Sequence, residues 1–236
     1  MDLTEHIRKV QATMAQAAVN AGRDPGEITL CAATKVQTDD TIRAAIAAGV
    51  PVCGENRVQE LTAHLEHNAY EGARVHFIGH LQTNKVKQVV GKVELIHSVD
   101  SLRLLQAINN QADKLGLIQD FLLEVNIAGE ESKGGCTPEL AWELARQSAQ
   151  LDHVRFRGLM AIPPVSTVPG ENRPWFRAMH QLFVDIKEKM SDNQGDITYL
   201  SMGMSGDYAD AIAEGSTLIR VGTALFGPRP PMVPRK

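Results

Sequence analysis

The fold is decided by a short apolar run that recurs along the chain, and its clearest instance is Phe121-Leu122-Leu123-Glu124-Val125-Asn126. A run of this length and composition is typical of a strand buried on both faces of a parallel sheet. Before it, Leu102, Leu105 and Ile108 recur at helical spacing. After it, Thr137-Pro138 is typical of an N-cap followed by proline at the first helical position. The local pattern is therefore helix, strand, helix.

The same alternation extends along the whole chain. Eight strands are predicted in all, at Ile28–Ala33, Pro51–Gly54, Val75–Ile78, Leu95–Ser98, Phe121–Asn126, Phe156–Ala161, Thr198–Met202 and Thr217–Gly222. An opening helix places Leu3, Ile7, Val10, Met14 and Ala18 on one stripe and stops at Gly22. Further helices are predicted around Val58–Leu65 and Phe176–Met190, with a shorter one at Met204–Glu214.

Eight strand and helix units fit two architectures, a closed (β/α)8 TIM barrel and a doubly wound open sheet. Eight regular units without a break favour the closed barrel, and 236 residues is a normal length for one. We therefore predict an α/β protein with a single domain over residues 1–236, in which an extra N-terminal helix precedes the barrel. Nine residues with four prolines follow Gly227, which predicts an extended or disordered tail and leaves no room for a second domain.

Composition and charge narrow the function classes. The net charge is -4 and the pI is near 6.1, so no basic field favours nucleic acid or an anionic membrane surface. The first residues, Met1–Glu5, do not resemble a secretory signal, and no apolar run approaches the roughly 18 residues of a membrane-spanning helix. We expect neither a membrane nor a nucleic-acid partner.

The cysteines and histidines indicate a reducing compartment and no metal centre. Cys31, Cys53 and Cys136 are far apart and form no C-x-x-C pair, which argues against a disulfide framework or a zinc site. Cys31 and Cys53 lie in strand-like runs and are expected to be buried. The eight histidines include no H-E-x-x-H motif. A cytoplasmic location is the expectation.

Lys35 is the first candidate for chemistry, because it follows the first predicted strand in Ala33-Thr34-Lys35. In a barrel, function gathers at the carboxyl ends of the strands. An ammonium that is partly desolvated there loses its proton more readily, as an amine must before it attacks an aldehyde. A lysine that merely extends into solvent at a strand end would look the same in the sequence.

A phosphate site is predicted after strands seven and eight, where barrels often bind this group. Ser205 and Gly206 open the segment after strand seven, and Gly222 and Thr223 end strand eight. Small residues with hydroxyls and unpaired backbone N–H groups can hold an anion. The alternative interpretation is that these residues are ordinary turn glycines and helix caps. An amine and a phosphate cradle together suggest a phosphorylated aldehyde across the barrel mouth.

Other polar residues at strand ends are weaker candidates. Asn56 is predicted to point into the mouth, whereas Glu55 and Arg57 are compatible with simple helix-start charges. His80 follows strand three and could contact the ligand, donate a proton or cap the next helix.

These segments resemble the pyridoxal phosphate homeostasis protein family, which is related to the N-terminal domain of alanine racemase. The resemblance runs in order through Ala33-Thr34-Lys35, Gly54-Glu55-Asn56, His76–Lys85, Gly158-Leu159-Met160, Leu200–Ser205 and Arg220–Gly227. It implies the barrel of alanine racemase type, known as pyridoxal phosphate fold type III. It also implies that pyridoxal 5'-phosphate is the cofactor.

The resemblance further implies a role for each matching residue. Lys35 is expected to hold the cofactor as a Schiff base and Arg220 to lie near the pyridine nitrogen, with Asn56 in the same site. The phosphate is expected to be held by Ser201, Ser205, Gly206, Gly222 and Thr223. Many relatives have an acidic residue where this chain has Gly206, but glycine still offers its N–H.

We expect a carrier of the cofactor rather than an enzyme, with an amino-acid racemase or decarboxylase as the alternative. Those enzymes resemble this barrel followed by a β domain that contributes an opposing tyrosine, and the short tail leaves no place for one. Two-sided proton transfer needs an acid and a base within about 3 Å, and only Lys35 is evident. Such a carrier is expected to be a monomer, with pyridoxal phosphate-dependent apoenzymes as the recipients of the cofactor.

Overall fold

The eight predicted strands close into a parallel barrel. The computed structural model describes residues 2–130, 133–190 and 196–228, and in it each strand pairs with the next until β8 returns to β1. The strands are β1 Thr29–Ala33, β2 Val52–Glu55, β3 Arg74–Phe77, β4 Leu95–Val99, β5 Gln119–Val125, β6 Val154–Ala161, β7 Tyr199–Ser201 and β8 Leu218–Val221. The predicted closed barrel is confirmed, and the open sheet is excluded.

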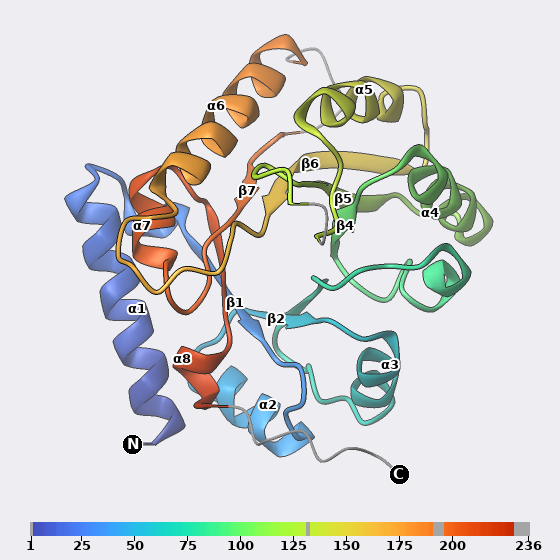
Figure 1. Ribbon diagram of the computed structural model, residues 1–236. Helices are drawn as coiled ribbons and strands as arrows, with labels where there is room; N and C mark the ends of the chain where they lie inside the picture. Colours follow the sequence, from blue (N-terminus) through green and yellow to red (C-terminus); the bar gives the residue numbers. More distant parts are fainter. Residues whose placement is uncertain (1, 131–132, 191–195, 229–236) are drawn as a thin grey trace.

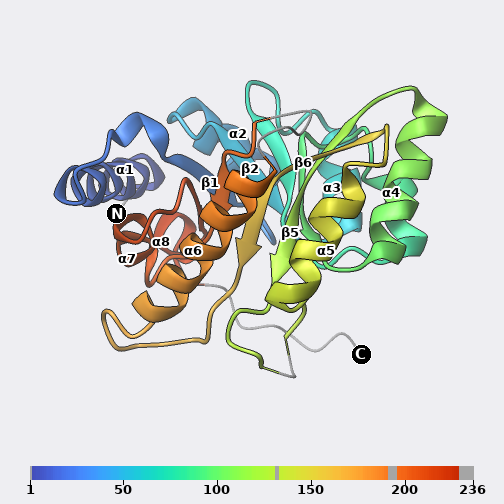
Figure 2. The ribbon, with the colours of Figure 1, turned by 90° about the horizontal axis from the view of Figure 1, so that it is seen from above.

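Helices surround this barrel (Figures 1 and 2). They are α1 Leu3–Asn20, α2 Asp39–Ala47, α3 Val58–Glu66, α4 Leu102–Leu115, α5 Pro138–Ser148, α6 Arg173–Lys189, α7 Tyr208–Ala213 and α8 Thr223–Phe226, with the 3-10 helices η1 Pro25–Glu27 and η2 Thr83–Gln88. The predicted extra helix α1 packs outside α7 and α8. Gly22 follows it with a φ of +70°, as expected for a terminating glycine.

The helices after β7 and β8 differ from the sequence-based expectation. The helix predicted from Met204 begins at Tyr208, because the Asp207 carboxylate accepts the Met204 N–H at 2.7 Å and holds the intervening residues in a turn. The short helix α8 was not predicted at all. At four residues it is too short to show a helical period.

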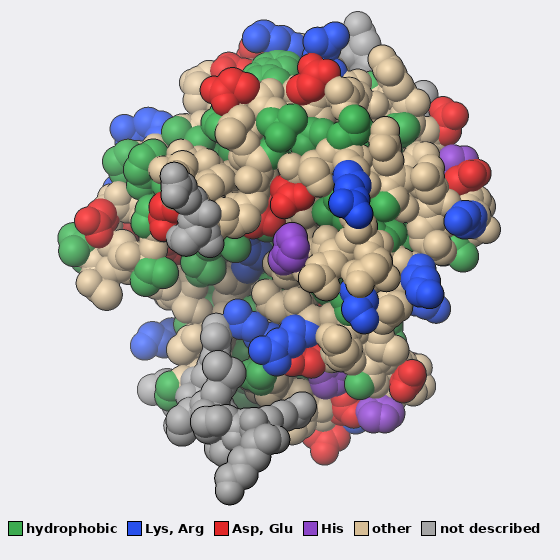
Figure 3. Space-filling view, turned by 45° about the vertical axis from the view of Figure 1, so that its right-hand side comes forward, with side chains coloured by type: hydrophobic (Ala, Val, Ile, Leu, Met, Phe, Trp, Pro, Cys, Tyr) green, Lys and Arg blue, Asp and Glu red, His purple; other side chains and the backbone are tan. Residues whose placement is uncertain are grey.

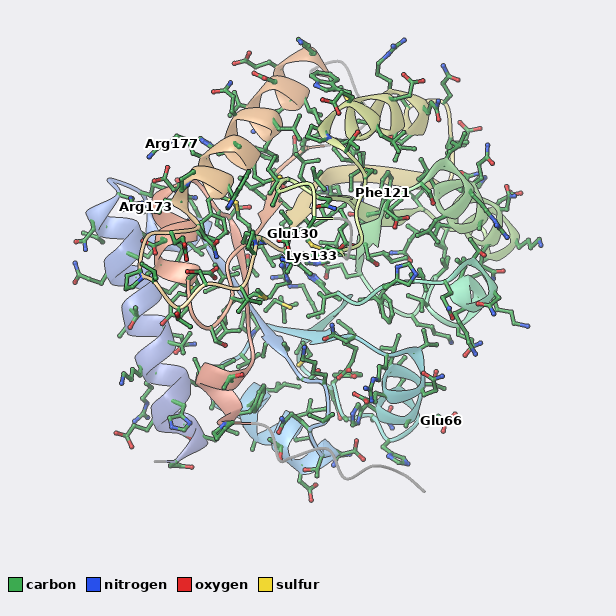
Figure 4. All side chains as sticks on the ribbon, in the orientation of Figure 1. Glu66, Phe121, Glu130, Lys133, Arg173 and Arg177 are labelled. Atoms are coloured by element: carbon green, nitrogen blue, oxygen red, sulfur yellow. The ribbon has the colours of Figure 1, made fainter. Side chains whose placement is uncertain are left out.

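The hydrophobic core lies mainly between the barrel and its helices. Phe77, Phe121 and Phe176 are among its largest fully buried side chains, and Figure 4 marks Phe121 on β5. The barrel interior has smaller apolar clusters, such as Cys31 with Val52 and Leu218. Polar side chains share that interior, namely His76, His97, Ser201 and Arg220.

The outer surface mixes charges of both signs, as Figure 3 shows for one face. Arg173 and Arg177 of α6 (Figure 4) both bind Glu214 after α7, with nitrogen to oxygen distances of 2.9 and 3.1 Å. Cys31, Cys53 and Cys136 are free and buried, as expected for the first two. Within the described part of the chain, no helix is long and apolar enough to cross a bilayer.

Candidate functional site

A cavity of about 240 Å³ lies at the carboxyl ends of the strands. It is lined by Ala33, Lys35, Asn56, Ile78, Ile162, Met204, Ser205, Gly206, Arg220, Gly222 and Thr223. Seven of the eight site residues predicted from the sequence are in this wall; Ser201 is the exception. A larger surface hollow of about 570 Å³, lined by Leu65, Tyr70 and Val75 among others, brings together no comparable set of amine, guanidinium and small residues.

Lys35 reaches the cavity from a backbone that is anchored on both sides. Thr34 is fully buried and donates its hydroxyl to the Gly54 carbonyl at 3.2 Å and to the Glu55 carboxylate. Val36 has a φ of +61°, a left-handed conformation that β-branched residues rarely adopt, and its N–H donates to Glu60. These anchors turn the half-buried Lys35 toward the cavity.

Glu55 has a different role from the helix-start charge considered in the sequence. It ends β2, is fully buried and accepts the Thr34 hydroxyl. Burial raises the pKa of the Glu55 carboxyl, and the hydrogen bond from Thr34 opposes part of that rise. Arg57 remains at the start of α3, where its guanidinium forms an ion pair with Glu60 at 3.2 Å.

Asn56 presents an unsatisfied acceptor in the cavity wall. Its Oδ1 atom is buried and has no hydrogen-bond partner among the described residues. Its backbone is fixed by a close approach of the loop after β3, since a Cβ atom at Gly79 would lie 2.1 Å from the Asn56 carbonyl oxygen. A buried orphan acceptor of this kind fits a ligand that donates a hydrogen bond.

The residues after β7 and β8 meet in the same cavity wall, next to the end of β1. The Ser205 hydroxyl oxygen accepts the N–H groups of both Gly222 and Ala224 at 3.2 Å. Gly206 leaves open space where a Cβ would stand, and Thr223 lines the cavity beside it. An oxygen atom therefore already sits against converging N–H donors, which is the environment that an anion needs.

Arg220 forms the floor of the cavity and is held firmly. Its Nη1 donates to the Ser201 carbonyl at 2.8 Å and to the Ser201 hydroxyl at 2.6 Å, and its Nη2 donates to the Ala161 carbonyl at 2.9 Å. Burial lowers the pKa of the Arg220 guanidinium, although arginine stays protonated in proteins. A fixed cation therefore faces the cavity.

Ser201 departs from its predicted role. It is fully buried on the inward face of β7, and its hydroxyl contacts Arg220 and His97 rather than the cavity. The structure therefore places Ser201 against Arg220 and outside the cavity wall. His80, the uncertain candidate, is exposed and lies outside the cavity wall.

The apolar part of the cavity wall was not predicted from the sequence. Ile78, Ile162 and Met204 line the cavity beside the polar groups. Two of these positions could have been predicted from the sequence. Ile162 directly follows β6, and Met204 directly precedes Ser205 at the mouth. The buried pair His76 and His97 was also missed, although each is a polar residue inside an apolar strand.

Sequence comparisons place this chain among known proteins. Residues 26–230 match the family model described as alanine racemase, N-terminal domain. The chain is 41% identical to a pyridoxal phosphate homeostasis protein of Aquifex aeolicus, over 97% of this chain and 99% of that protein. It is 40% identical to the protein of the same name in Pseudomonas aeruginosa, over 96% of each chain.

Solved structures with the same fold include PipY of Synechococcus elongatus with pyridoxal phosphate bound. That structure is 32% identical, has a TM-score of 0.82, and the match covers 96% of this chain and all of PipY. An alanine racemase of Clostridium difficile shares the fold at a TM-score of 0.72 with 14% identity, and the match covers 96% of this chain and 57% of the racemase.

Proposed function

Because this chain belongs to the pyridoxal phosphate homeostasis proteins, a family built on the alanine racemase N-terminal domain, we propose that it carries pyridoxal 5'-phosphate as a Schiff base on Lys35. Its role is to buffer or deliver the cofactor without substantial amino-acid turnover. The observation that supports this most strongly is that the Lys35 amine shares one cavity with Ser205, Gly206, Gly222 and Thr223, where the Ser205 hydroxyl accepts two backbone N–H groups.

Each part of the cavity fits one part of the cofactor. The Lys35 amine is placed to capture the aldehyde, and Ser205, Gly206, Gly222 and Thr223 surround the place for the phosphate. Asn56 would offer its unsatisfied Oδ1 to a donor of the ligand, and Arg220 would lie near the pyridine nitrogen. When bound, the cofactor supplies an aldehyde that amines capture reversibly and a ring that can accept electrons.

The cavity wall favours a carrier over a racemase. Of the residues that line it in the described chain, only Lys35 and Arg220 are ionisable. Arginine is a poor proton donor and acceptor because it stays protonated, so Lys35 is the single evident acid or base. A cation near the pyridine nitrogen would also oppose its protonation, which would weaken the ring as an electron sink.

The setting of this function is also part of the proposal. Three free buried cysteines suit a reducing compartment, and we propose that the protein works in the cytoplasm. Its recipients are pyridoxal phosphate-dependent apoenzymes, which compete for the carried aldehyde with amines of their own.

Absorption titration with pyridoxal phosphate tests the site. Wild-type protein is expected to develop a saturable imine band at one equivalent, and Lys35→Ala is expected to lose it. Lys114→Ala is the matched control, because Lys114 lies in the last turn of α4, at the other end of the barrel. An unchanged band in Lys35→Ala, with Lys114→Ala behaving as wild type, would contradict the assignment.

Incubation of the loaded protein with single enantiomers of amino acids then separates carrier from enzyme. We expect no sustained conversion at an ordinary enzymatic rate, taken here as about 1 s⁻¹ or faster. Turnover at that rate would favour the racemase alternative.

A further inference from the structure

A line of polar side chains runs through the barrel interior from the cavity to the opposite end. We call it the interior chain, and it consists of Arg220, Ser201, His97, His76 and Glu94. Arg220 contacts the Ser201 hydroxyl at 2.6 Å, and that oxygen lies 3.1 Å from His97 Nδ1. His97 Nε2 lies 3.0 Å from His76 Nδ1, and His76 Nε2 faces the Glu94 carboxylate at 3.7 Å.

The interior chain crosses most of the molecule. Arg220, on β8, lines the cavity at the carboxyl ends of the strands. Glu94 immediately precedes β4, at the amino ends, and keeps 40% of its side chain exposed beside Arg74. Between these ends Ser201, His97 and His76 are fully buried. In the closed order of eight strands, β4 lies across the barrel from β8, so the hydrogen bonds between Arg220, Ser201, His97 and His76 span its interior.

The hydrogen bonds of the interior chain all run in one donor-to-acceptor direction, from Arg220 toward His76. Arginine only donates, so the Ser201 oxygen accepts from Arg220. The serine hydroxyl then has its own hydrogen to donate, and its other partner in the described chain is His97 Nδ1. Burial lowers the pKa of His97 well below its ordinary value, so the ring is neutral. His97 accepts at Nδ1 and must carry its hydrogen on Nε2.

The same donor-to-acceptor direction fixes the hydrogen position on His76, at the end of the interior chain near Glu94. His97 Nε2–H donates to His76 Nδ1, so His76 also carries its hydrogen on Nε2. That N–H points toward Glu94, whose carboxyl pKa is lowered by His76 and by Arg74. The carboxylate is therefore anionic and favours this direction. A half-exposed anion at one end and a buried cation at the other polarise the hydrogen bonds between them in the same sense.

Packing alone does not account for these residues. The interiors of such barrels are normally filled by Val, Ile and Leu. Two fully buried imidazoles and a serine are costly to desolvate, and apolar side chains would fill the same space. His76 Nε2 faces Glu94 at 3.7 Å and has no hydrogen-bond partner among the described residues. These polar side chains contact one another in sequence and end at Arg220, the buried cation in the cavity wall.

We propose that His97 and His76 are positioning residues, which hold the Ser201 hydroxyl as an acceptor for Arg220 and so fix the guanidinium in the cavity wall where the cofactor would bind. This proposal rests on the proposed function, because Arg220 matters here as the group facing the ring. His97 and His76 do not touch the ligand. They act through Ser201.

Two substitutions and a matched control test the proposal. Ser201→Ala removes the acceptor, and His97→Phe keeps a ring of similar shape without its nitrogens. Both are expected to weaken pyridoxal phosphate binding about tenfold, the effect of losing a hydrogen bond to a charged group. The pH at which the band of the bound cofactor changes should also rise, because a displaced Arg220 no longer opposes protonation of the ring.

Ser216→Ala is the control. Ser216 is as fully buried as Ser201, but its hydroxyl donates to backbone carbonyls of Leu200, Met202 and Leu218 and has no contact with the interior chain. This variant is expected to lose stability while keeping the wild-type dissociation constant and pH profile. Wild-type binding by both Ser201→Ala and His97→Phe would overturn the proposal.

A second measurement needs neither substitution nor cofactor. Nitrogen-15 NMR of the histidine rings in the wild-type protein reports which nitrogen carries hydrogen, and we expect Nε2–H for both His76 and His97. An Nδ1–H form of either ring overturns the proposal. A wild-type protein that shows these tautomers but forms no imine band would refute the proposed function instead, and with it the role assigned to the interior chain.

Discussion

At the scale of single residues, the site depends on the unusual backbone beside Lys35. Val36 adopts a φ of +61° although it is β-branched. Its side chain is 51% exposed, so little packing holds it there. The conformation is sustained instead by neighbours, including the hydrogen bond from its N–H to Glu60. Local strain of this kind is common next to functional groups.

Val36→Asn should therefore stabilise the protein. Asparagine tolerates the left-handed region, and the relieved strain is about 1 kcal/mol in the free energy of unfolding. Urea unfolding measures the gain. Val19→Asn is the control, because Val19 is 58% exposed in the regular helix α1. Equal effects of the two substitutions would show that Val36 is not strained.

Glu55 predicts a pH dependence of stability. Its pKa is raised by burial, so the folded state binds the proton more tightly than the unfolded state does. The stability contributed by this residue is therefore present at low pH and falls as pH rises through the raised pKa. Glu55→Gln resembles the protonated form and should melt at a higher temperature than wild type at neutral pH.

The difference between Glu55→Gln and wild type should vanish below the ordinary carboxyl pKa of about 4, where both states are protonated. Melting temperatures measured across pH test this. Glu66→Gln serves as control, because Glu66 projects outward from α3 (Figure 4). A Glu55→Gln protein that is less stable than wild type at neutral pH would contradict the assignment.

The positions of residues at strand ends could be predicted from the sequence, whereas the side chains that they contact could not. Lys35, Asn56 and Gly222 could be placed at one mouth because parallel strands of a barrel end on the same side. Ser201 could not be separated from Ser205 by that argument. Its partner His97 lies 104 residues away, and no local pattern in the sequence links the two.

At the scale of elements, close approach between loops positions the site. The loop after β3 passes so near to the start of α3 that only glycine fits at position 79. Helix caps follow simpler local rules: the predicted cap Thr137 accepts the Leu140 N–H at 3.2 Å. Caps were therefore predictable from the sequence, and the contact between loops was not.

Gly79→Ala should impair binding through Asn56. The new Cβ would stand 2.1 Å from the Asn56 carbonyl oxygen, so the backbone of one loop must move. We expect a loss of about 1–3 kcal/mol in stability from overpacking, together with about tenfold weaker pyridoxal phosphate binding. Gly26→Ala is the control, since its Cβ would approach Asp24 only to 3.4 Å. Wild-type affinity in Gly79→Ala would show that Asn56 is not a ligand contact.

At the scale of the whole molecule, closure of the barrel explains why distant segments form one site. β8 pairs with β1, which brings Arg220 beside Cys31 and places Gly222 within reach of Ala33. The count of eight units predicted this closure, because an eighth parallel strand can return to the first. The contents of the interior were not predictable in the same way. Which inward positions hold polar residues that meet depends on the stagger of all eight strands.

Borohydride trapping followed by peptide mass mapping tests whether Lys35 holds pyridoxal phosphate covalently. The protein is mixed with less than one equivalent of pyridoxal phosphate, reduced and digested. We predict that the pyridoxyl phosphate label is found on the peptide containing Lys35, and that Lys35→Ala takes up only scattered surface label. A label concentrated on another lysine, with Lys35 unmodified, would contradict it.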